Sequence, residues 1–144
     1  MIMNKNEISA KIEELLGKPY VVIDFLPEQV SVEKGDNYFK TEAFFLKNKE
    51  YLYRRFAYFI IKLSSYCDLI IDDNKTIYHE FDPQGLFDMF LSADYRTCLN
   101  ILIAEKDCLI SFHGDDLYMT VYNADDRLEE LLGKLAISEQ LFLR

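Results

Sequence analysis

The stretch that decides the fold is residues 108–122, CLISFHGDDLYMTVY. Two apolar segments, 109–112 and 117–122, flank the tetrapeptide His113-Gly114-Asp115-Asp116. Large apolar and β-branched residues favour strands, whereas Gly and Asp favour the turn between two strands. The stretch therefore predicts a β-hairpin, and a hairpin implies an antiparallel sheet.

A helix is predicted directly after this hairpin. Asn123 can cap it, and Asp125 and Asp126 lie in its first turn, where the helix dipole favours acidic side chains. Its apolar positions recur at helical spacing: Leu128, Leu131, Leu132 and Leu135.

Residues 95–104, YRTCLNILIA, precede the hairpin and fit both a strand and a helix. The Ile-rich run and the turn-like residues 105–107 that follow favour a strand, and a helix stays the alternative.

The rest of the chain alternates helical and extended patterns. Phe39, Thr41, Ala43 and Phe45 alternate along one face, which predicts a strand. The elements expected before residue 95 are a helix over 6–16, a strand over 20–26, a loop over 27–37, a strand over 38–46, a helix over 48–64, strands over 66–71 and 76–81 around the turn 72–75, and a helix that begins at Asp82-Pro83.

These elements predict an α+β fold with a mostly antiparallel sheet and helices packed on one face. The 144 residues correspond to a single domain, 1–144, and half of them are hydrophobic, which is enough for a substantial core.

The charge is distributed unevenly. The chain carries 16 Lys and Arg against 25 Asp and Glu, a net charge of −9. Residues 1–64 hold 10 basic and 9 acidic residues, whereas residues 65–144 hold 6 and 16, a net of −10. An acidic protein repels nucleic acid and anionic membrane, so neither is expected as a direct partner. The excess acts either as a solubilising surface or as a face that attracts a basic partner.

The cysteines, the N-terminal segment and the lengths of the apolar runs indicate the expected cellular location. Cys67, Cys98 and Cys108 are odd in number, lack CxxC spacing and lie in apolar runs, so buried free thiols are expected. The charged N-terminal segment is unlike a signal peptide, and no run approaches the roughly 20 apolar residues of a membrane span. The expected location is the cytoplasm.

Few residues suggest catalysis. His79, His113 and Asp115 could ligate a divalent metal, but no metal-site spacing supports them. A Cys–His nucleophile pair is disfavoured because the thiols are expected to be buried. Glycine-rich phosphate loops and serine nucleophile motifs are absent. The expected protein is therefore not an enzyme and needs no cofactor or metal.

Two stretches carry a resemblance: YVVIDFLPEQV…YFKTEAFFL with SSYCDLII, and CLISFHGDDLYMTVYNADDRLEELLGKLAISEQLFLR. Together they resemble the small acidic immunity proteins of bacterial polymorphic toxin systems, which protect against contact-dependent growth-inhibition toxins. The resemblance covers about three quarters of the chain. It implies a tight complex with a cognate toxin, often a basic nuclease domain, and no enzymatic activity.

The leading hypothesis is thus a cytoplasmic protein that neutralises a toxin by stoichiometric binding. Turn and loop carboxylates are the predicted toxin contacts: Asp72, Asp73, Glu80, Asp82, Asp115 and Asp116. A small metal-dependent enzyme using His79, His113 and Asp115, or a regulatory protein-interaction module, are the alternatives. The oligomeric state, the toxin's activity, and whether its active site or an exosite is bound stay open.

Overall fold

The computed structural model describes residues 3–144, so Met1 and Ile2 of the predicted domain lie outside the described residues. The strands are β1 (Tyr20–Asp24), β2 (Ile70–Asp72), β3 (Ile77–Tyr78), β4 (Cys98–Ile103), β5 (Cys108–His113), β6 (Tyr118–Tyr122) and β7 (Phe142–Leu143). The helices are α1 (Lys5–Leu15), α2 (Gly35–Lys47), α3 (Lys49–Leu63), α4 (Pro83–Leu91) and α5 (Asp126–Ser138), with short 3₁₀ turns η1 (Val32–Lys34) and η2 (Ala104–Lys106).

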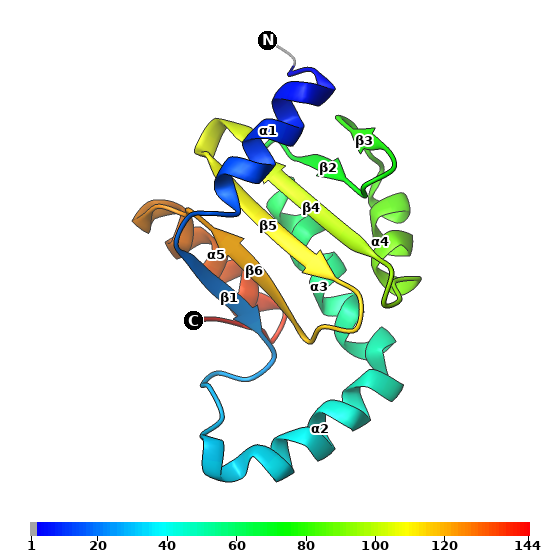
Figure 1. The fold of residues 1–144 in the computed structure, drawn as a ribbon, viewed down its shortest axis with the longest axis vertical. Helices are drawn as coiled ribbons and strands as arrows, with labels where there is room; N and C mark the ends of the chain where they lie inside the picture. Colours follow the sequence, from blue (N-terminus) through cyan, green and yellow to red (C-terminus); the bar gives the residue numbers. More distant parts are fainter. Residues whose placement is uncertain (1–2) are drawn as a thin grey trace.

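All the strands join one sheet in the order β3-β2-β4-β5-β6-β1-β7 (Figure 1). Every neighbouring pair is antiparallel. The predicted α+β class and the 108–122 hairpin are confirmed, and residues 98–103 of the ambiguous 95–104 segment form a strand.

Three helices, α3, α4 and α5, cover one face of the sheet and enclose the main core. The core is strongly aromatic because α3 presents Tyr53, Phe56 and Phe59 to it, where they meet Phe90 of α4 and Phe112 of β5. Tyr53 and Phe112 pack edge to face with ring centroids 4.9 Å apart. The predicted apolar side of the 48–64 helix is therefore its buried side.

The opposite face is covered in part by α1, whereas the sequence predicts helices on one face only. Ile8, Ile12 and Leu15 of α1 pack against Leu102 and Leu109 in a second, smaller core. Neighbouring residues of a strand point to opposite faces, so Leu102 and Leu109 join this core while Ile101 and Ile110 join the main one.

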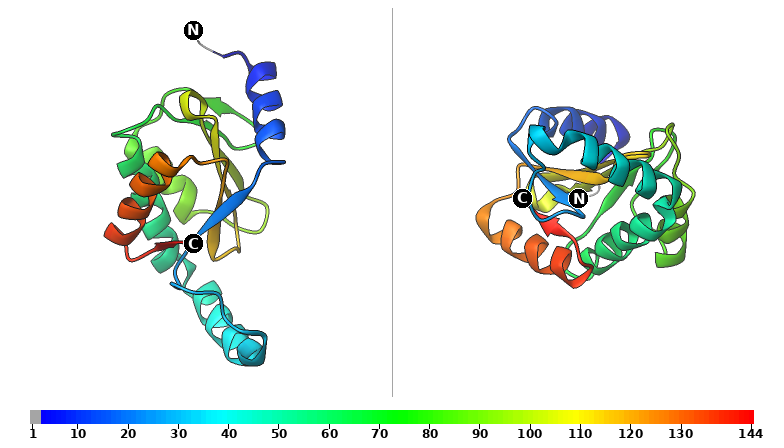
Figure 2. Two further views of the ribbon diagram at one scale, coloured as in Figure 1. Left: turned by 90° about the vertical axis from the view of Figure 1, so that its left-hand side faces the viewer. Right: turned by 90° about the horizontal axis from the view of Figure 1, so that it is seen from below.

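The predicted strand over 38–46 is wrong, and the predicted loop over 27–37 is too long, because residues 35–47 form α2. Alternation over so few residues also fits a helix whose inner positions are Tyr38, Thr41 and Phe45. Helix α2 buries no residue completely and projects from the body, below the sheet in Figure 1 and in the left view of Figure 2. Asn48, with φ −118° and ψ 34°, separates it from α3.

Other predicted boundaries shift by a few residues. Strand β1 ends at Asp24 rather than residue 26, β2 begins at Ile70 rather than residue 66, and β3 covers only Ile77–Tyr78. Asp82 caps α4 as predicted, with Pro83 at its first position.

Asn123 does not cap α5. The cap is Asp125, whose Oδ1 accepts a hydrogen bond from the Leu128 N–H at 2.7 Å. Asn123 instead adopts a positive φ of 66° and donates its side-chain amide to the Asp107 carbonyl at 2.8 Å, so it ties two loops together.

Candidate functional site

The six predicted contact carboxylates do not form one surface. The 72–75 turn and the 113–116 turn lie at the same end of the sheet, because Asp72 pairs with Asn100 and Cys98 pairs with His113 in successive antiparallel ladders. Glu80 and Asp82 follow β3 and lie beyond its other end. The prediction therefore joins two separate regions.

Asp72 and Asp73 stabilise their own turn. The Asp72 Oδ1 accepts the N–H of Asn74 at 2.8 Å, and the Asp73 Oδ1 accepts the N–H groups of Lys75 and Thr76 at 2.9 and 2.7 Å. Asp82 does the same for α4 by accepting the Gly85 N–H at 2.7 Å. These three carboxylates have local structural partners.

The 113–116 turn is held by contacts with other parts of the chain. Asp115 has a positive φ of 71° and forms an ion pair with Lys49 Nζ at 3.0 Å. The Asp116 carbonyl accepts a hydrogen bond from the buried Tyr53 hydroxyl at 2.9 Å. Gly114 packs so tightly on Asp94 that an added Cβ would lie 1.6 Å from the Asp94 carbonyl oxygen.

The Asp116 side chain differs from that of Asp115 because it has no ion-pair partner among residues 3–144. Burial raises the pKa of the Asp116 carboxyl, His113 offsets part of this rise, and the carboxylates of Asp115 and Glu42 add to it. Glu42 belongs to α2, so α2 and the 113–116 turn face each other.

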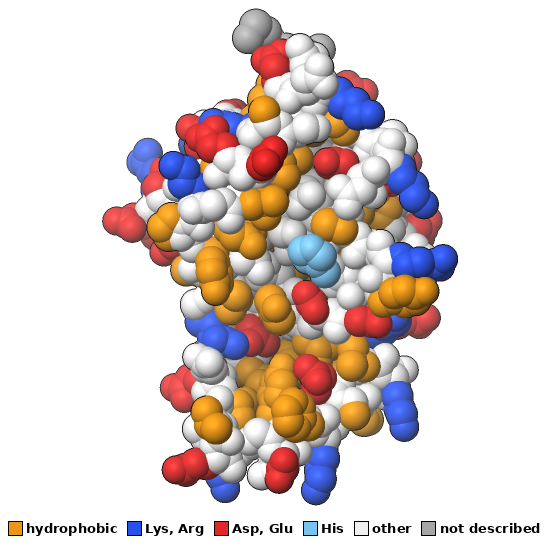
Figure 3. Space-filling model, viewed as in Figure 1, with side chains coloured by type: hydrophobic (Ala, Val, Ile, Leu, Met, Phe, Trp, Pro, Cys, Tyr) orange, Lys and Arg blue, Asp and Glu red, His pale blue; other side chains and the backbone are white. Residues whose placement is uncertain are grey.

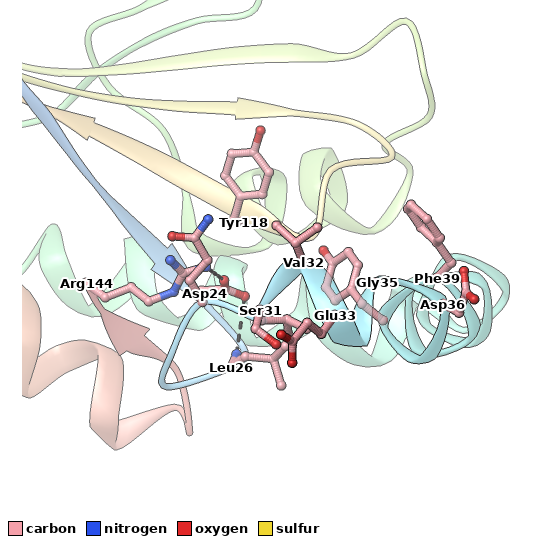
Figure 4. Close-up of a pocket in the computed structure, with 13 residues that line it drawn as sticks. Asp24, Leu26, Ser31, Val32, Glu33, Gly35, Asp36, Phe39, Tyr118 and Arg144 are labelled. Atoms are coloured by element: carbon pink, nitrogen blue, oxygen red, sulfur yellow. Dashed lines mark hydrogen bonds and ion pairs between the residues drawn. The ribbon is translucent and has the colours of Figure 1, made fainter.

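A cleft of about 580 Å³ opens next to this turn. One wall comes from the loop before η1, from η1 and from the first turn of α2, and the other from β1, β6 and the C-terminal strand segment. In Figure 4, Val32, Glu33 and Phe39 lie across from Tyr118 and Arg144. We call this space the α2 cleft. The sequence does not predict the α2 cleft, because the pattern over residues 27–46 favours a loop and a strand.

One end of the α2 cleft holds an ion pair between a buried carboxylate and a more exposed guanidinium. Asp24 is 6% exposed, and its carboxylate pairs with the Arg144 guanidinium and accepts the Leu26 N–H. Arg144 also exchanges two backbone hydrogen bonds with Val22, at 2.8 and 2.9 Å. Among residues 3–144, Arg144 is the single cationic side chain that lines the cleft, and this pairing neutralises it.

The remaining charge of the α2 cleft is negative. Glu33 and Asp36 line it, Glu42 and Asp116 lie close to it, and none of the four has an ion-pair partner in the described part of the chain. We call Glu33, Asp36, Glu42 and Asp116 the cleft carboxylates. In the space-filling view, hydrophobic side chains gather in the lower part of this face, with both acidic and basic side chains around them (Figure 3).

Two tyrosines of the cleft reflect this electrostatic environment. Burial raises the pKa of Tyr38, and the carboxylates of Glu42 and Asp24 raise it further. Burial likewise raises the pKa of Tyr118, with a further contribution from Asp116. Both hydroxyls therefore stay neutral at physiological pH and present hydrogen-bonding groups beside apolar rings.

The proposed metal ligands do not converge. His79 follows β3 and His113 ends β5, with β2 and β4 between them. Within residues 3–144, no three His, Cys, Asp or Glu side chains are grouped so that they could hold a metal ion. The predicted alternative with His79, His113 and Asp115 as ligands therefore has no assembled site in this structure.

The cysteines differ in exposure. Cys67 and Cys108 are buried as predicted, and burial raises the pKa of Cys108 to about 12. Cys98 is only half-buried, in contrast to the prediction, and its Sγ lies 3.5 Å from His113 Nε2. Burial raises the pKa of the Cys98 thiol, which disfavours the thiolate that a nucleophile requires.

Comparison with family models, with curated proteins and with solved structures finds no match for this chain. The resemblance to immunity proteins stays a prediction. Among residues 3–144, no helix combines the length and the apolar character needed to cross a membrane. The class of the chain is thus an α+β domain with an open, acidic and aromatic cleft.

Proposed function

We propose that the chain is an immunity protein that neutralises a basic toxin domain by forming a stoichiometric complex with it. One observation carries the proposal: the cleft carboxylates lie in or beside a cleft with an aromatic and apolar lining, and none of the four forms an ion pair within the described part of the chain. A nuclease domain is a suitable partner because proteins that bind polyanionic substrates carry clustered Lys and Arg.

The chemistry of the α2 cleft suits a protein partner better than a small substrate. Interfaces combine aromatic side chains at their centre with charged groups that select the partner. Tyr38, Phe39 and Tyr118 supply the aromatic part, and the cleft carboxylates supply the charge. We infer binding rather than a reaction, because aromatic rings together with unpaired carboxylates are what an interface with a basic protein requires.

Capture from the native host tests this function. The full chain, immobilised on beads, is incubated with host lysate, washed at low and at high salt, and the retained proteins are identified and quantified by mass spectrometry. We expect a basic toxin domain at one-to-one stoichiometry, and we expect co-expression of the chain to restore growth of cells that produce this domain. Empty beads from cells that demonstrably express a neighbouring toxin, or capture without protection, would contradict the proposal.

A pair of charge-matched variants makes the test specific. The cleft variant carries Glu33→Gln, Asp36→Asn and Glu42→Gln. The control variant carries Glu13→Gln, Asp68→Asn and Asp126→Asn, at exposed positions without ion pairs. Both variants lose three negative charges. We expect the cleft variant to bind the captured domain at least about tenfold more weakly, and the control variant to bind as the unchanged chain does.

A further inference from the structure

The side of α2 that borders the cleft has a pattern of its own. Phe39 lies on this side with Glu42 three residues further along the helix, and Tyr38 also lines the cleft, so aromatic rings and a carboxylate lie together. Phe39 is 63% exposed and lines the cleft. Phe44 is equally exposed, at 61%, but it lies about 140° further around the helix and does not line the cleft.

The wall continues into η1, where Val32 is 98% exposed and also lines the cleft. Val32 and Phe39 therefore present apolar surface to solvent from two successive turns of the chain. Such adjacent exposed apolar side chains mark interaction sites more often than scattered ones do.

Charge decides which occupant fits this wall. A purely apolar segment would desolvate the cleft carboxylates without giving them partners, which is costly. A second copy of this chain would bring Glu33, Asp36 and Glu42 against like charges. A nucleic acid or an anionic membrane would be repelled for the same reason. The remaining occupant carries cationic and apolar side chains together.

We propose that the α2 cleft receives an amphipathic cationic segment of the partner protein, whose apolar side chains pack on Val32, Phe39 and Tyr118 while its Lys or Arg side chains pair with the cleft carboxylates. This inference rests on the proposed function and names the part of the partner that is recognised. Lys and Arg suit the site because their aliphatic stems pack on aromatic rings while their charged ends reach carboxylates.

A designed peptide tests the recognition without knowledge of the toxin. The probe is a fluorescein-labelled 18-residue peptide of Leu and Lys, with Leu at helical spacing, titrated with the full chain by fluorescence anisotropy. Its comparators are a scrambled peptide of the same composition and a version with Glu in place of Lys. We expect the amphipathic cationic probe to bind at least about tenfold more tightly than either comparator.

Matched variants locate the binding. Phe39→Ser should weaken probe binding about tenfold, whereas Phe44→Ser, on the same helix and equally exposed, should leave it unchanged. The cleft variant should weaken binding and flatten its salt dependence, and the control variant should do neither. Circular dichroism of each variant confirms that the fold is kept.

Three results would overturn this inference. If Phe39→Ser and Phe44→Ser lose probe affinity equally, or if neither loses any, the probe does not bind at the cleft wall. A dimer in analytical ultracentrifugation that Phe39→Ser dissociates would assign the surface to a second copy of the chain. Capture of a basic toxin that binds the Phe39→Ser chain normally would leave the proposed function standing and refute this inference alone. Probe binding with the expected variant pattern, but no captured toxin, would leave this inference standing and refute the proposed function.

Discussion

Gly114 shows how one residue fixes the position of the turn beside the cleft. Its N–H donates to the Thr97 carbonyl at 2.9 Å, and its Cα faces the Asp94 backbone with no room for a side chain. The contact is with backbone, so the neighbour cannot rotate away. This glycine therefore holds the 113–116 turn against the 94–97 loop.

Gly114→Ala should lower the free energy of unfolding by about 2–4 kcal/mol, because the added Cβ displaces one of the two loops. Gly133→Ala, in α5, is the matched control, since nothing lies within 4 Å of the added Cβ. We expect it to raise the stability by about 0.5–1 kcal/mol through helix propensity. Urea denaturation of both variants measures the difference, and equal effects would disprove the packing argument.

Asp116 makes stability depend on pH in a defined direction. The pKa of its carboxyl is raised in the folded state, so this group's contribution is fully present below its unfolded pKa, about 3.9, and is lost as pH rises through the raised value. The groups that face it are Asp115, Glu42 and His113. Asp116→Asn should therefore gain stability relative to the unchanged chain as the pH rises from the acid range to neutrality. Parallel stability curves would contradict this expectation, and Asp126→Asn serves as the exposed control.

Among the elements, strong local signals predicted the structure well. The 108–122 hairpin, the 48–64 helix and the Asp82-Pro83 helix start have turn residues, helical spacing or a cap that the sequence displays directly. Each of these elements also presents several buried apolar residues to the core. Agreement between the local pattern and burial made these predictions correct.

Helix α2 lacked that agreement, and the candidate site lies on it. Its apolar residues are half-exposed, so neither a helical nor a strand periodicity dominates the segment. The strand position beside β1 is taken by β7 instead, which only the tertiary fold reveals. Of the predicted contacts, Asp116 alone belongs to the cleft carboxylates, because their proximity depends on this misassigned helix.

The sparse packing of α2 predicts its dynamics. Its contacts with the rest of the chain centre on Phe45, whose ring centroid lies 4.6 Å from that of Phe25. We expect the backbone amides of α2 to exchange with deuterium at least about tenfold faster than those of α3, because fewer buried contacts must break. Bound probe peptide should slow exchange in α2. Equal exchange in the two helices would show that α2 is held by more than these contacts.

At the scale of the whole molecule, the fold redistributes the charge. The sequence places the acidic excess in residues 65–144, yet Glu33, Asp36 and Glu42 come from the nearly neutral first part. The fold brings Glu42 near Asp116 and places Glu33 and Asp36 in the lining of the α2 cleft. A count of charges along the sequence therefore indicates the sign of the charge expected of the proposed partner, but not the place where it would bind.

Electrostatic steering should govern the rate of association. Raising the salt concentration from about 0.05 to 0.3 M should lower the association rate of the captured toxin about tenfold or more and change its dissociation rate much less. The cleft variant should also dissociate faster, because it loses contacts, whereas the control variant should keep both rates close to those of the unchanged chain. Surface plasmon resonance separates the two rates. An association rate that does not depend on salt would exclude steering.

The Asp24–Arg144 pair joins residues 120 positions apart and forms one end of the α2 cleft. On a ribosome, the residues of β1 emerge long before those of β7. Until Arg144 has left the exit tunnel, the Asp24 carboxylate has no guanidinium partner and β1 lacks its outer strand. The nascent chain thus cannot present a finished α2 cleft before Arg144 has emerged, so the proposed binding of a partner cannot begin on a shorter nascent chain.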